Sequence, residues 1–341
     1  MEVTISSFLI GFNTAFFTIF AVHILVFRQK RTRFQTVIGI IMAIWGVMNI
    51  KDIILLFPGM YREDVLNWII IIDGWMALTY LVFVFETTQP GWTTWRNLLP
   101  KMLPFGLFTA AFAVWPNQRV IIAYEFFLWF FAWAVVILGY IRYREYLNYV
   151  HDNYSNLENI DVSWLKPVFF FAIVSQLLWL FTSINSMIWT DIIYYLSTIS
   201  LWLAVLYYTW NFHPIEVQTY ETATATSEKD CPFPVMLEEV VEQQQLYLQA
   251  DFNINDLCKA VGSNRSYVSS YLNKVIGLTF YDYINRLRIE RQSIPMILNY
   301  PEYTIEHVAH KSGFSSISTF RRAFVKFAGV TPSQFKAKHS K

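Results

Sequence analysis

Near the C-terminus, basic and small polar side chains recur at the spacing at which a helix can present them to a nucleic acid. On a helix predicted to begin near Ile317, the outward-facing residues include Arg321 and Arg322. An exposed arginine can donate two parallel hydrogen bonds to O6 and N7 of guanine, or bind a backbone phosphate. The outward-facing residues of this helix are Ile317, Ser318, Arg321 and Arg322. A second outward-facing set lies upstream and consists of Arg265, Ser266, Ser269, Ser270 and Asn273.

Two pairs of short helices must position these side chains. In Thr304–Lys336, apolar residues recur at helical spacing on both sides of Ser312-Gly313, which interrupts the pattern. Phe252–Gly277 repeats this arrangement, with Ser263 predicted as the N-cap of its second helix. Both are helix–turn–helix patterns, whose second helix can lie in a major groove. Their inward-facing residues are Ile305, Val308, Ala309, Ile317, Phe320, Ala323, Phe324 and Phe327, and Ile254, Leu257, Cys258, Val261, Val268, Tyr271, Leu272 and Val275.

The pattern GF…S…F.R.F…G.TP in residues 313–332 resembles the second half of the DNA-binding domain of AraC/XylS-family bacterial transcription factors. Residues 252–277 and a long helix from Phe280 resemble the first half, and the resemblance covers Val235 to Lys336. It implies two helix–turn–helix motifs that are joined by a linking helix and bind double-stranded DNA. By its place in the family motif, Arg321 corresponds to a variable base-reading position. Arg322 corresponds to the family's fixed arginine, which implies a phosphate or structural contact.

Two residues depart from the family pattern. Pro295 stands where the linking helix usually continues with leucine, and a proline inside a helix costs about 3 kcal/mol. The linking helix is therefore expected to end early or to kink near this residue. Val325 replaces a commonly basic residue, which removes one expected phosphate contact.

The rest of the chain has a different composition. The whole sequence is 55% hydrophobic, 18% aromatic and only 15% charged, and the apolar excess lies before about residue 212. Apolar stretches of roughly 20 residues predict membrane-spanning helices. The first apolar stretch is expected to remain as a membrane span and not to be cleaved as a signal peptide, since residues 1–8 lack the basic residues with which a signal peptide begins. The predicted spans are Ser7–Phe27, Phe34–Phe57, Leu66–Phe85, Leu98–Trp115, Val120–Ile141, Pro167–Trp189 and Ile192–Trp210.

Lysine and arginine in the loops predict the orientation of the chain. Alternate loops are basic, and basic loops remain in the cytoplasm. The N-terminus is therefore expected outside a bacterial cytoplasmic membrane and the C-terminus inside, where DNA is present. The residues behind this prediction are Arg28, Lys30, Arg31, Arg33, Arg96, Lys101, Arg142, Arg144 and Lys166, against Arg62 and Arg119 in the opposite loops.

Polar residues inside the predicted spans gather in what would be the outer half of the bilayer. Charged groups at that depth are costly, and they usually pair or bind a ligand. Two interpretations remain open: structural hydrogen bonds between helices, or a pocket that senses a small molecule or pH. Three acids against one lysine favour a cationic ligand or a response to pH. The candidate sensing residues are Asn49, Lys51, Asp52, Asp73, Glu125 and Asn185, with Asn13 at a similar depth.

The predicted architecture is all-α, with a seven-helix transmembrane bundle in residues 1–212 and an AraC-type domain in residues 235–341. Residues 213–234 lack a hydrophobic period, which predicts a flexible cytoplasmic linker. Cys231 and Cys258 are interpreted as structural, since their spacing forms no metal site. Catalytic motifs are not found, so neither an enzyme nor a cofactor is expected.

The sequence therefore predicts a membrane-bound one-component transcriptional regulator. Its expected partners are double-stranded DNA, the lipid bilayer, a small-molecule or pH signal and, through the flexible linker, a second copy of the chain. Two alternatives stay open. One is a transporter or membrane enzyme that carries a regulatory DNA-binding tail. The other is a receptor whose helix–turn–helix motifs no longer bind DNA.

Overall fold

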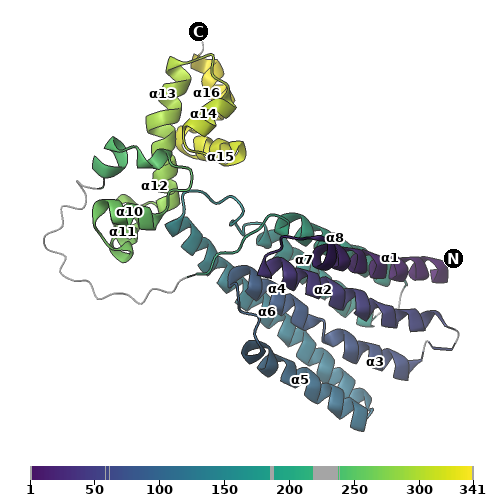
Figure 1. The fold of residues 1–341 in the computed structure, drawn as a ribbon. Helices are drawn as coiled ribbons and strands as arrows, with labels where there is room; N and C mark the ends of the chain where they lie inside the picture. The colour runs from purple at the N-terminus through teal and green to yellow at the C-terminus, as the bar shows by residue number, and fades with distance from the viewer. Residues whose placement is uncertain are drawn as a thin grey trace. The chain divides into compact units, whose positions relative to one another are not determined.

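The computed structural model describes residues 2–57, 59–60, 62–184, 188–217, 237 and 239–339. Each regular element in these ranges is a helix, which confirms the predicted all-α fold (Figure 1). The chain forms two compact units. The first contains Met1–Tyr146 and Val162–Val217, and the second contains Leu147–Asp161 and Gln218–Lys341. Asn185, Cys231 and most of the predicted linker lie outside the described residues.

The first unit is built from long apolar helices. Helix α1 packs against α2 and α8, and α7 packs against α8 (Figure 1). A π-helical turn, His23–Phe27, extends α1, and a 3-10 turn, Lys51–Leu56, extends α2. The helices are α1 (Glu2–Val22), α2 (Arg33–Ile50), α3 (Glu63–Gly74), α4 (Ala77–Thr88), α5 (Trp95–Val114), α6 (Gln118–Asn153, whose last residues belong to the second unit), α7 (Leu165–Ile184) and α8 (Ile188–Thr209).

Five helical stretches in the described part of the chain are long and apolar enough to cross a membrane, which indicates membrane association. They coincide with the first five predicted spans, and the third is divided into α3 and α4 by a bend at Trp75 and Met76. Helix α7 contains a shorter apolar stretch, Leu165–Leu178, and α8 covers the seventh predicted span. The five stretches are Ser7–Phe27, Arg33–Ile54, Glu63–Thr88, Trp95–Val114 and Gln118–Asn153.

Apolar side chains cover the outside of these helices. On α5, Leu99, Leu103 and Leu107 follow one another every four residues and are 64%, 62% and 62% exposed. Phe126 and Phe130 form a similar pair on α6. A continuous apolar stripe of this kind is costly in water but not in hydrocarbon. The pattern is therefore typical of helices that face lipid.

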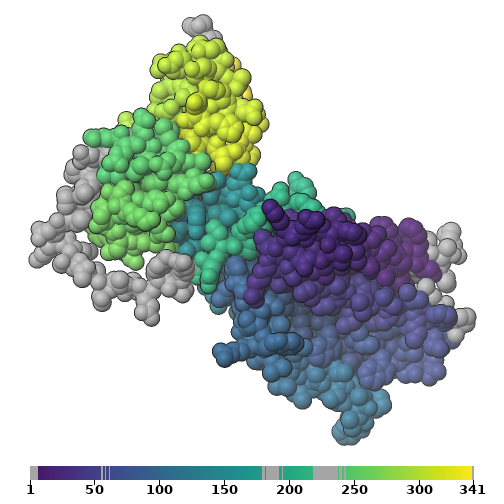
Figure 2. All heavy atoms as spheres, in the orientation of Figure 1, coloured from purple at the N-terminus to yellow at the C-terminus, as the bar shows by residue number. Residues whose placement is uncertain are grey.

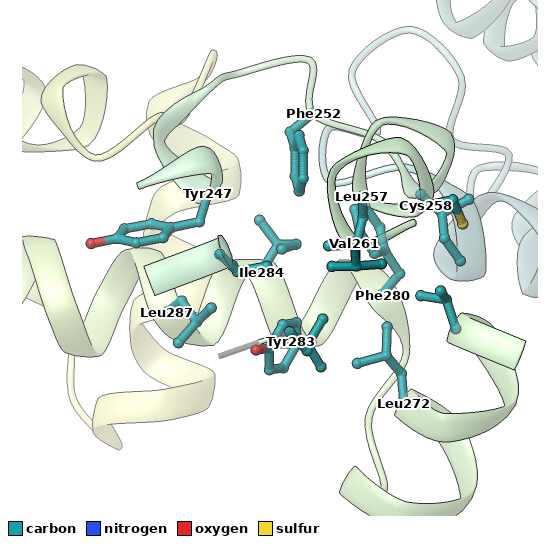
Figure 3. Packing of buried hydrophobic residues seen from close by; sticks show 14 residues of the cluster. Tyr247, Phe252, Leu257, Cys258, Val261, Leu272, Phe280, Tyr283, Ile284 and Leu287 are labelled. Carbon is teal, nitrogen blue, oxygen red and sulfur yellow. The ribbon is translucent and has the colours of Figure 1, made fainter. Parts of the chain in front are cut away.

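The second unit contains two small helical lobes, shown in green and yellow in Figure 2. Figure 3 shows the core of the first lobe, in which Leu257 and Val261 of α10 and Phe280 and Ile284 of α12 pack together with Phe252. The second lobe packs around Phe320 and Phe324. The helices are α10 (Ile254–Val261), α11 (Arg265–Tyr271), α12 (Phe280–Leu287), α13 (Ile294–Asn299), α14 (Ile305–Lys311), α15 (Ile317–Ala328) and α16 (Pro332–His339).

Local chemistry sets the ends of the helices in the first lobe. Asn253 begins α10 through a capping box with Asp256, and Gly262 ends it with a φ of 65°. Asn264 caps α11 by accepting a hydrogen bond from the N–H of Tyr267, so the prediction of Ser263 as the N-cap is wrong by one residue. Cys258 is buried, and burial raises the pKa of its thiol to about 11, in agreement with a structural role.

The last turn of the first recognition helix differs from the prediction. Val275 is 68% exposed rather than buried. Leu272–Ile276 forms a π-helical turn after α11, and this turn changes the angular position of later side chains relative to a regular α-helix. The prediction that Val275 faces inward depends on a regular α-helix with 3.6 residues per turn. The regular helix gives way to the π-helical turn at Leu272, before Val275 is reached.

The linking helix continues through Pro295. A π-helical turn, Arg288–Ser293, lies between α12 and α13, and the N–H of Ile294 donates to the carbonyl oxygen of Ile289. Pro295 then occupies the first turn of α13, where its missing N–H costs little. The predicted interruption is thus confined to a widened turn, and helical structure continues to Asn299.

Candidate nucleic-acid interface and membrane cavity

The second helix–turn–helix motif consists of α14 and α15. Thr304 and Ser316 cap the two helices with their side chains. Gly313, in the turn between them, has a φ of 83°, and a Cβ here would lie 2.6 Å from the carbonyl oxygen of Leu248. Only glycine fits this turn without strain. The sequence signal Ser312-Gly313 therefore marks a position that the packing of the domain requires.

Helix α15 presents its arginines to solvent. Phe320 and Phe324 are fully buried on its inner face, whereas Ser318, Arg321 and Arg322 are exposed. An α-helix anchored by two buried aromatic side chains holds its opposite face in a fixed direction, as reading of base edges requires. This half of the predicted interface is thus displayed on one surface.

Two other residues of α15 alter the predicted interface. Ile317, which the sequence pattern assigned to both faces, is half-buried and packs against the core of the second lobe. Its predicted exposure is wrong because the start of α15 lies over the buried core of the second lobe. Val325 is 43% exposed, so an apolar side chain stands where the family pattern has a basic one.

An ion pair joins the second recognition helix to the linking helix. The Nζ atom of Lys326 lies 2.6 Å from Oδ1 of Asp282 on α12. The Asp282 side chain is 16% exposed and that of Lys326 is 53% exposed, so water screens the pair only in part. No local pattern in the sequence indicates this contact, because the two residues are far apart in the chain. The pair helps to hold α15 against the linking helix.

The first recognition helix is less accessible. Ser266 and Asn273 are exposed, but Arg265, Ser269 and Ser270 are half-buried. The guanidinium carbon of Arg265 lies 4.9 Å from the ring centre of Tyr149. Nδ2 of Asn273 donates to Oδ1 of Asp152 at 3.3 Å. Two of the five predicted DNA contacts in this motif are therefore engaged by side chains from the end of α6.

The partner of this motif is residues 147–161, called here the interhelix segment. In the chain it connects the fifth and sixth predicted spans, and it belongs to the same compact unit as both helix–turn–helix motifs. Ser155 donates to the carbonyl oxygen of Phe252 from its backbone N–H at 3.2 Å and from its hydroxyl at 2.5 Å. Asn156 donates to Asp251 and accepts from Ser315, so the segment contacts both lobes.

Arg288 is the centre of a buried hydrogen-bond network around this segment. It is 1% exposed, and its Nε donates to the carbonyl oxygen of Tyr247 at 2.6 Å. Nη2 donates to the carbonyl oxygen of Gln249 at 2.7 Å and to Oγ of Ser155 at 3.1 Å. Nη1 donates to the carbonyl oxygen of Ser155 and to Oδ1 of Asn285. Burial lowers the pKa of Arg288 to about 10, so the side chain stays charged at neutral pH.

Comparison with known families supports the assignment of this unit. Residues 257–338 match the family model described as a helix-turn-helix domain. The matched range runs from within α10 to α16 and contains the exposed arginines of α15. These residues form an AraC-type helix-turn-helix domain.

Relatives of the chain include transcriptional regulators. It is 31% identical over 98 residues to uncharacterized HTH-type transcriptional regulators from Staphylococcus aureus strains COL and MSSA476, covering 29% of this chain and 13% of each relative. It is 29% identical over 87 residues to the Msm operon regulatory protein of Streptococcus mutans, covering 26% of this chain and 31% of the relative. The chain therefore spans only a small part of these relatives' lengths. No solved structure matches the chain.

Away from the AraC-type domain, the first unit brings several predicted sensing residues together. Nζ of Lys51 lies 2.5 Å from Oδ1 of Asp52 and 2.7 Å from Oδ1 of Asp73. Asn49 donates instead to the carbonyl oxygen of Trp45, one turn earlier on α2. These contacts join the end of α2 to α3. Lys51, Asp52 and Asp73 thus form one cluster.

A cavity of about 430 Å³ opens beside this cluster. Asn13, Asn49, Asp52 and Asp73 line it, whereas the half-buried Glu125 does not. Its size lies in the range of small-molecule sites. The aromatic part of its wall could not be predicted from the sequence, because rings on different spans share no local motif. These rings are Trp45, Tyr80, Phe83, Trp133 and Trp202.

Proposed function

We propose that the protein is a membrane-bound one-component transcriptional regulator. The observation that carries this proposal is one chain that contains both an AraC-type domain, with exposed arginines on α15, and five apolar helices able to span a membrane. In this proposal the membrane helices receive the signal and the AraC-type domain binds specific DNA. Signal and response then need no phosphate transfer, because one polypeptide carries both parts.

The charge balance of the AraC-type domain favours contacts from a few specific side chains over non-specific electrostatic attraction to DNA. From Val235 onward the chain has 13 lysine and arginine residues and 9 acidic residues, a net charge of +4. This excess is modest, so affinity depends on a few side chains that reach base edges or phosphates. Arg321 and Arg322 are the best placed, since both are exposed on α15.

Contacts within the first unit support the proposed orientation. Arg28 and Gln35 donate to the carbonyl oxygen of Trp210, at the end of α8. Arg33 pairs with Glu86 and donates to the carbonyl oxygen of Thr93. The first loop, the third loop and the end of the last span therefore lie at one end of the bundle. In our proposal this end faces the cytoplasm, and the chain leaves it toward the AraC-type domain.

The proposed function is tested by mapping the genomic DNA that the intact protein occupies in living cells. We expect discrete sites that share a sequence motif, and their loss when Arg321 and Arg322 are both changed to alanine. The same experiment tests the orientation, because an AraC-type domain on the extracellular side of the membrane would occupy no genomic site. An occupancy map identical to that of the double variant would contradict the proposal. A transporter or enzyme with a degenerate tail would then be the better interpretation.

The interhelix segment offers a route by which the membrane helices act on DNA binding. It engages Arg265 and Asn273, which are also predicted DNA contacts. A side chain cannot hold both partners at once, so DNA binding by the first motif competes with the segment. A signal that shifts the membrane helices would then change how long the first recognition helix is free.

Loosening this contact should strengthen DNA binding. We expect a variant with Tyr149→Leu and Asp152→Ala to bind its specific site roughly tenfold more tightly, since a cation–π contact and one hydrogen bond no longer oppose DNA. Affinity is measured on the full chain in lipid nanodiscs. Glu158→Ala is the charge-matched control, because Glu158 is exposed on the same segment. Equal affinities of variant and control, or weaker binding by the variant, would show that the segment does not compete with DNA.

A further inference from the structure

The wall of the cavity in the first unit is rich in aromatic rings that pack against one another. The ring centres of Trp45 and Trp202 are 5.7 Å apart, and those of Tyr80 and Trp202 are 6.0 Å apart. Trp45 also packs at 5.7 Å from Tyr80. Faces of tryptophan and tyrosine attract cations through their quadrupole, and such groups of rings bind organic ammonium ions. The apolar part of this wall therefore suits a cation with an organic body.

The charged groups at the cavity carry a net negative charge. Asp52 and Asp73 line the cavity, and Lys51 is paired with both. One lysine balances one of the two carboxylates, which leaves a formal charge of −1. An uncompensated charge in an apolar setting is unfavourable, and a bound cation would neutralise it. An anionic ligand would instead add to the repulsion.

Polar atoms in the cavity wall supply a second, independent observation. Five buried side-chain atoms that line it have no hydrogen-bond partner among the described residues. Asn13, for example, is 1% exposed, yet its Oδ1 is unpaired. Buried polar groups in folded proteins are nearly always paired, so a set of unpaired groups around one cavity indicates a polar occupant. The five atoms are Asn13 Oδ1, Trp133 Nε1, Ser175 Oγ, Thr198 Oγ1 and Trp202 Nε1.

We propose that this cavity binds a small organic ammonium ion with an apolar or aromatic body. The ammonium group lies near Asp73, the body packs against the wall formed by Trp45, Tyr80 and Trp202, and polar substituents on it bond to atoms such as Asn13 Oδ1. That this ligand is the signal rests on the regulator function proposed above. Its binding to the cavity does not, because binding can be measured without DNA.

The test compares three probes of nearly the same shape and different charge: 2-naphthylethylamine, 2-naphthylethanol and 2-naphthylacetate. Binding to the full chain in phosphatidylcholine nanodiscs is measured by calorimetry, with empty nanodiscs subtracted. We expect the ammonium form to bind roughly tenfold more tightly than the alcohol, in line with one charge-assisted hydrogen bond, and the carboxylate to bind least. Equal affinities of amine and alcohol would overturn the proposal and indicate a cavity filled by neutral molecules or lipid tails.

Two variants locate the probe. Asp73→Asn leaves Lys51 paired with Asp52 and removes the net charge, so it should lower the affinity for the amine to that for the alcohol. Unchanged affinity for the alcohol shows that the cavity is intact. Glu145→Gln removes the same charge at an exposed ion pair outside the cavity and should change neither affinity. An affinity for the amine that is unchanged by Asp73→Asn would contradict the proposed site. If the unmodified protein binds the amine as expected but binds no specific DNA site, the regulator function would be contradicted and the cavity proposal would stand.

Discussion

Replacing Arg288 by methionine is expected to destabilise the AraC-type domain by roughly 3–5 kcal/mol, because buried acceptors are left unpaired. Methionine fills a similar volume but donates no hydrogen bonds. The carbonyl oxygens of Tyr247 and Ser155 would then lose their buried donor, whereas that of Gln249 keeps the backbone N–H of Phe252. Leaving buried acceptors unpaired costs about 1–3 kcal/mol each before relaxation and water entry reduce the sum. The guanidinium carbon also lies 5.4 Å from the ring centre of Phe314, so the loss would reach the second lobe.

This effect can be measured by hydrogen exchange on the full chain in nanodiscs. We expect the amides of α10 and α12 to lose protection in Arg288→Met. Arg291→Met is the matched control, because Arg291 is exposed three residues further along the linking helix. Ser155→Ala should cause a smaller loss, and the double variant should show less than the sum of the two, since both residues belong to one network. Equal protection in the Arg288 and Arg291 variants would refute the structural role of this network.

Arg321→Ala is expected to weaken binding to the specific DNA site by about 1–3 kcal/mol and to relax the preference at one base pair. The physical reason is that an exposed arginine on α15 can form a bidentate contact with guanine, which alanine cannot replace. Arg321 lies far from the buried face of the helix, so the fold should be unaffected. Selection of binding sites from random duplexes by the full chain measures both the affinity and the base preference.

Arg322→Ala separates base reading from attraction to phosphate. Arg322 is exposed beside Arg321, but its place in the family motif implies a phosphate or structural contact. Its loss should weaken binding to all sequences by a similar factor and reduce the dependence on salt by about one counterion. If Arg321→Ala lowers affinity without changing the selected sequence, Arg321 contacts the backbone and another residue reads the base.

Much of the fold can be predicted from the sequence because its signals are local. The period of Phe320, Ala323 and Phe324 defines the inner face of α15, and all three are buried as expected. Apolar length defines the first five spans in the same way. Errors occur where the backbone departs from a regular helix. The π-helical turn at Leu272–Ile276 exposes Val275, and a similar turn at Arg288–Ser293 accommodates Pro295.

The candidate sites show the same division. Exposure of Arg321 and Arg322 follows from helical period alone. The engagement of Arg265 by Tyr149 does not, because 116 residues separate them along the chain. Such contacts carry no period or motif, and only the folded chain brings them together.

The amino-acid sequence by itself determined the helical elements, the division into an apolar part and an AraC-type domain, and the exposure of Arg321 and Arg322 on α15. Each depends on hydrophobic period, turn chemistry or the length of apolar segments, which act over a few neighbouring residues. Tertiary structure alone decided that the interhelix segment joins the AraC-type domain through Arg288 and Ser155. It also decided that two carboxylates, and polar atoms without a partner among the described residues, surround one cavity. Burial and pairing depend on side chains that are distant in sequence, so they are settled only when the helices pack.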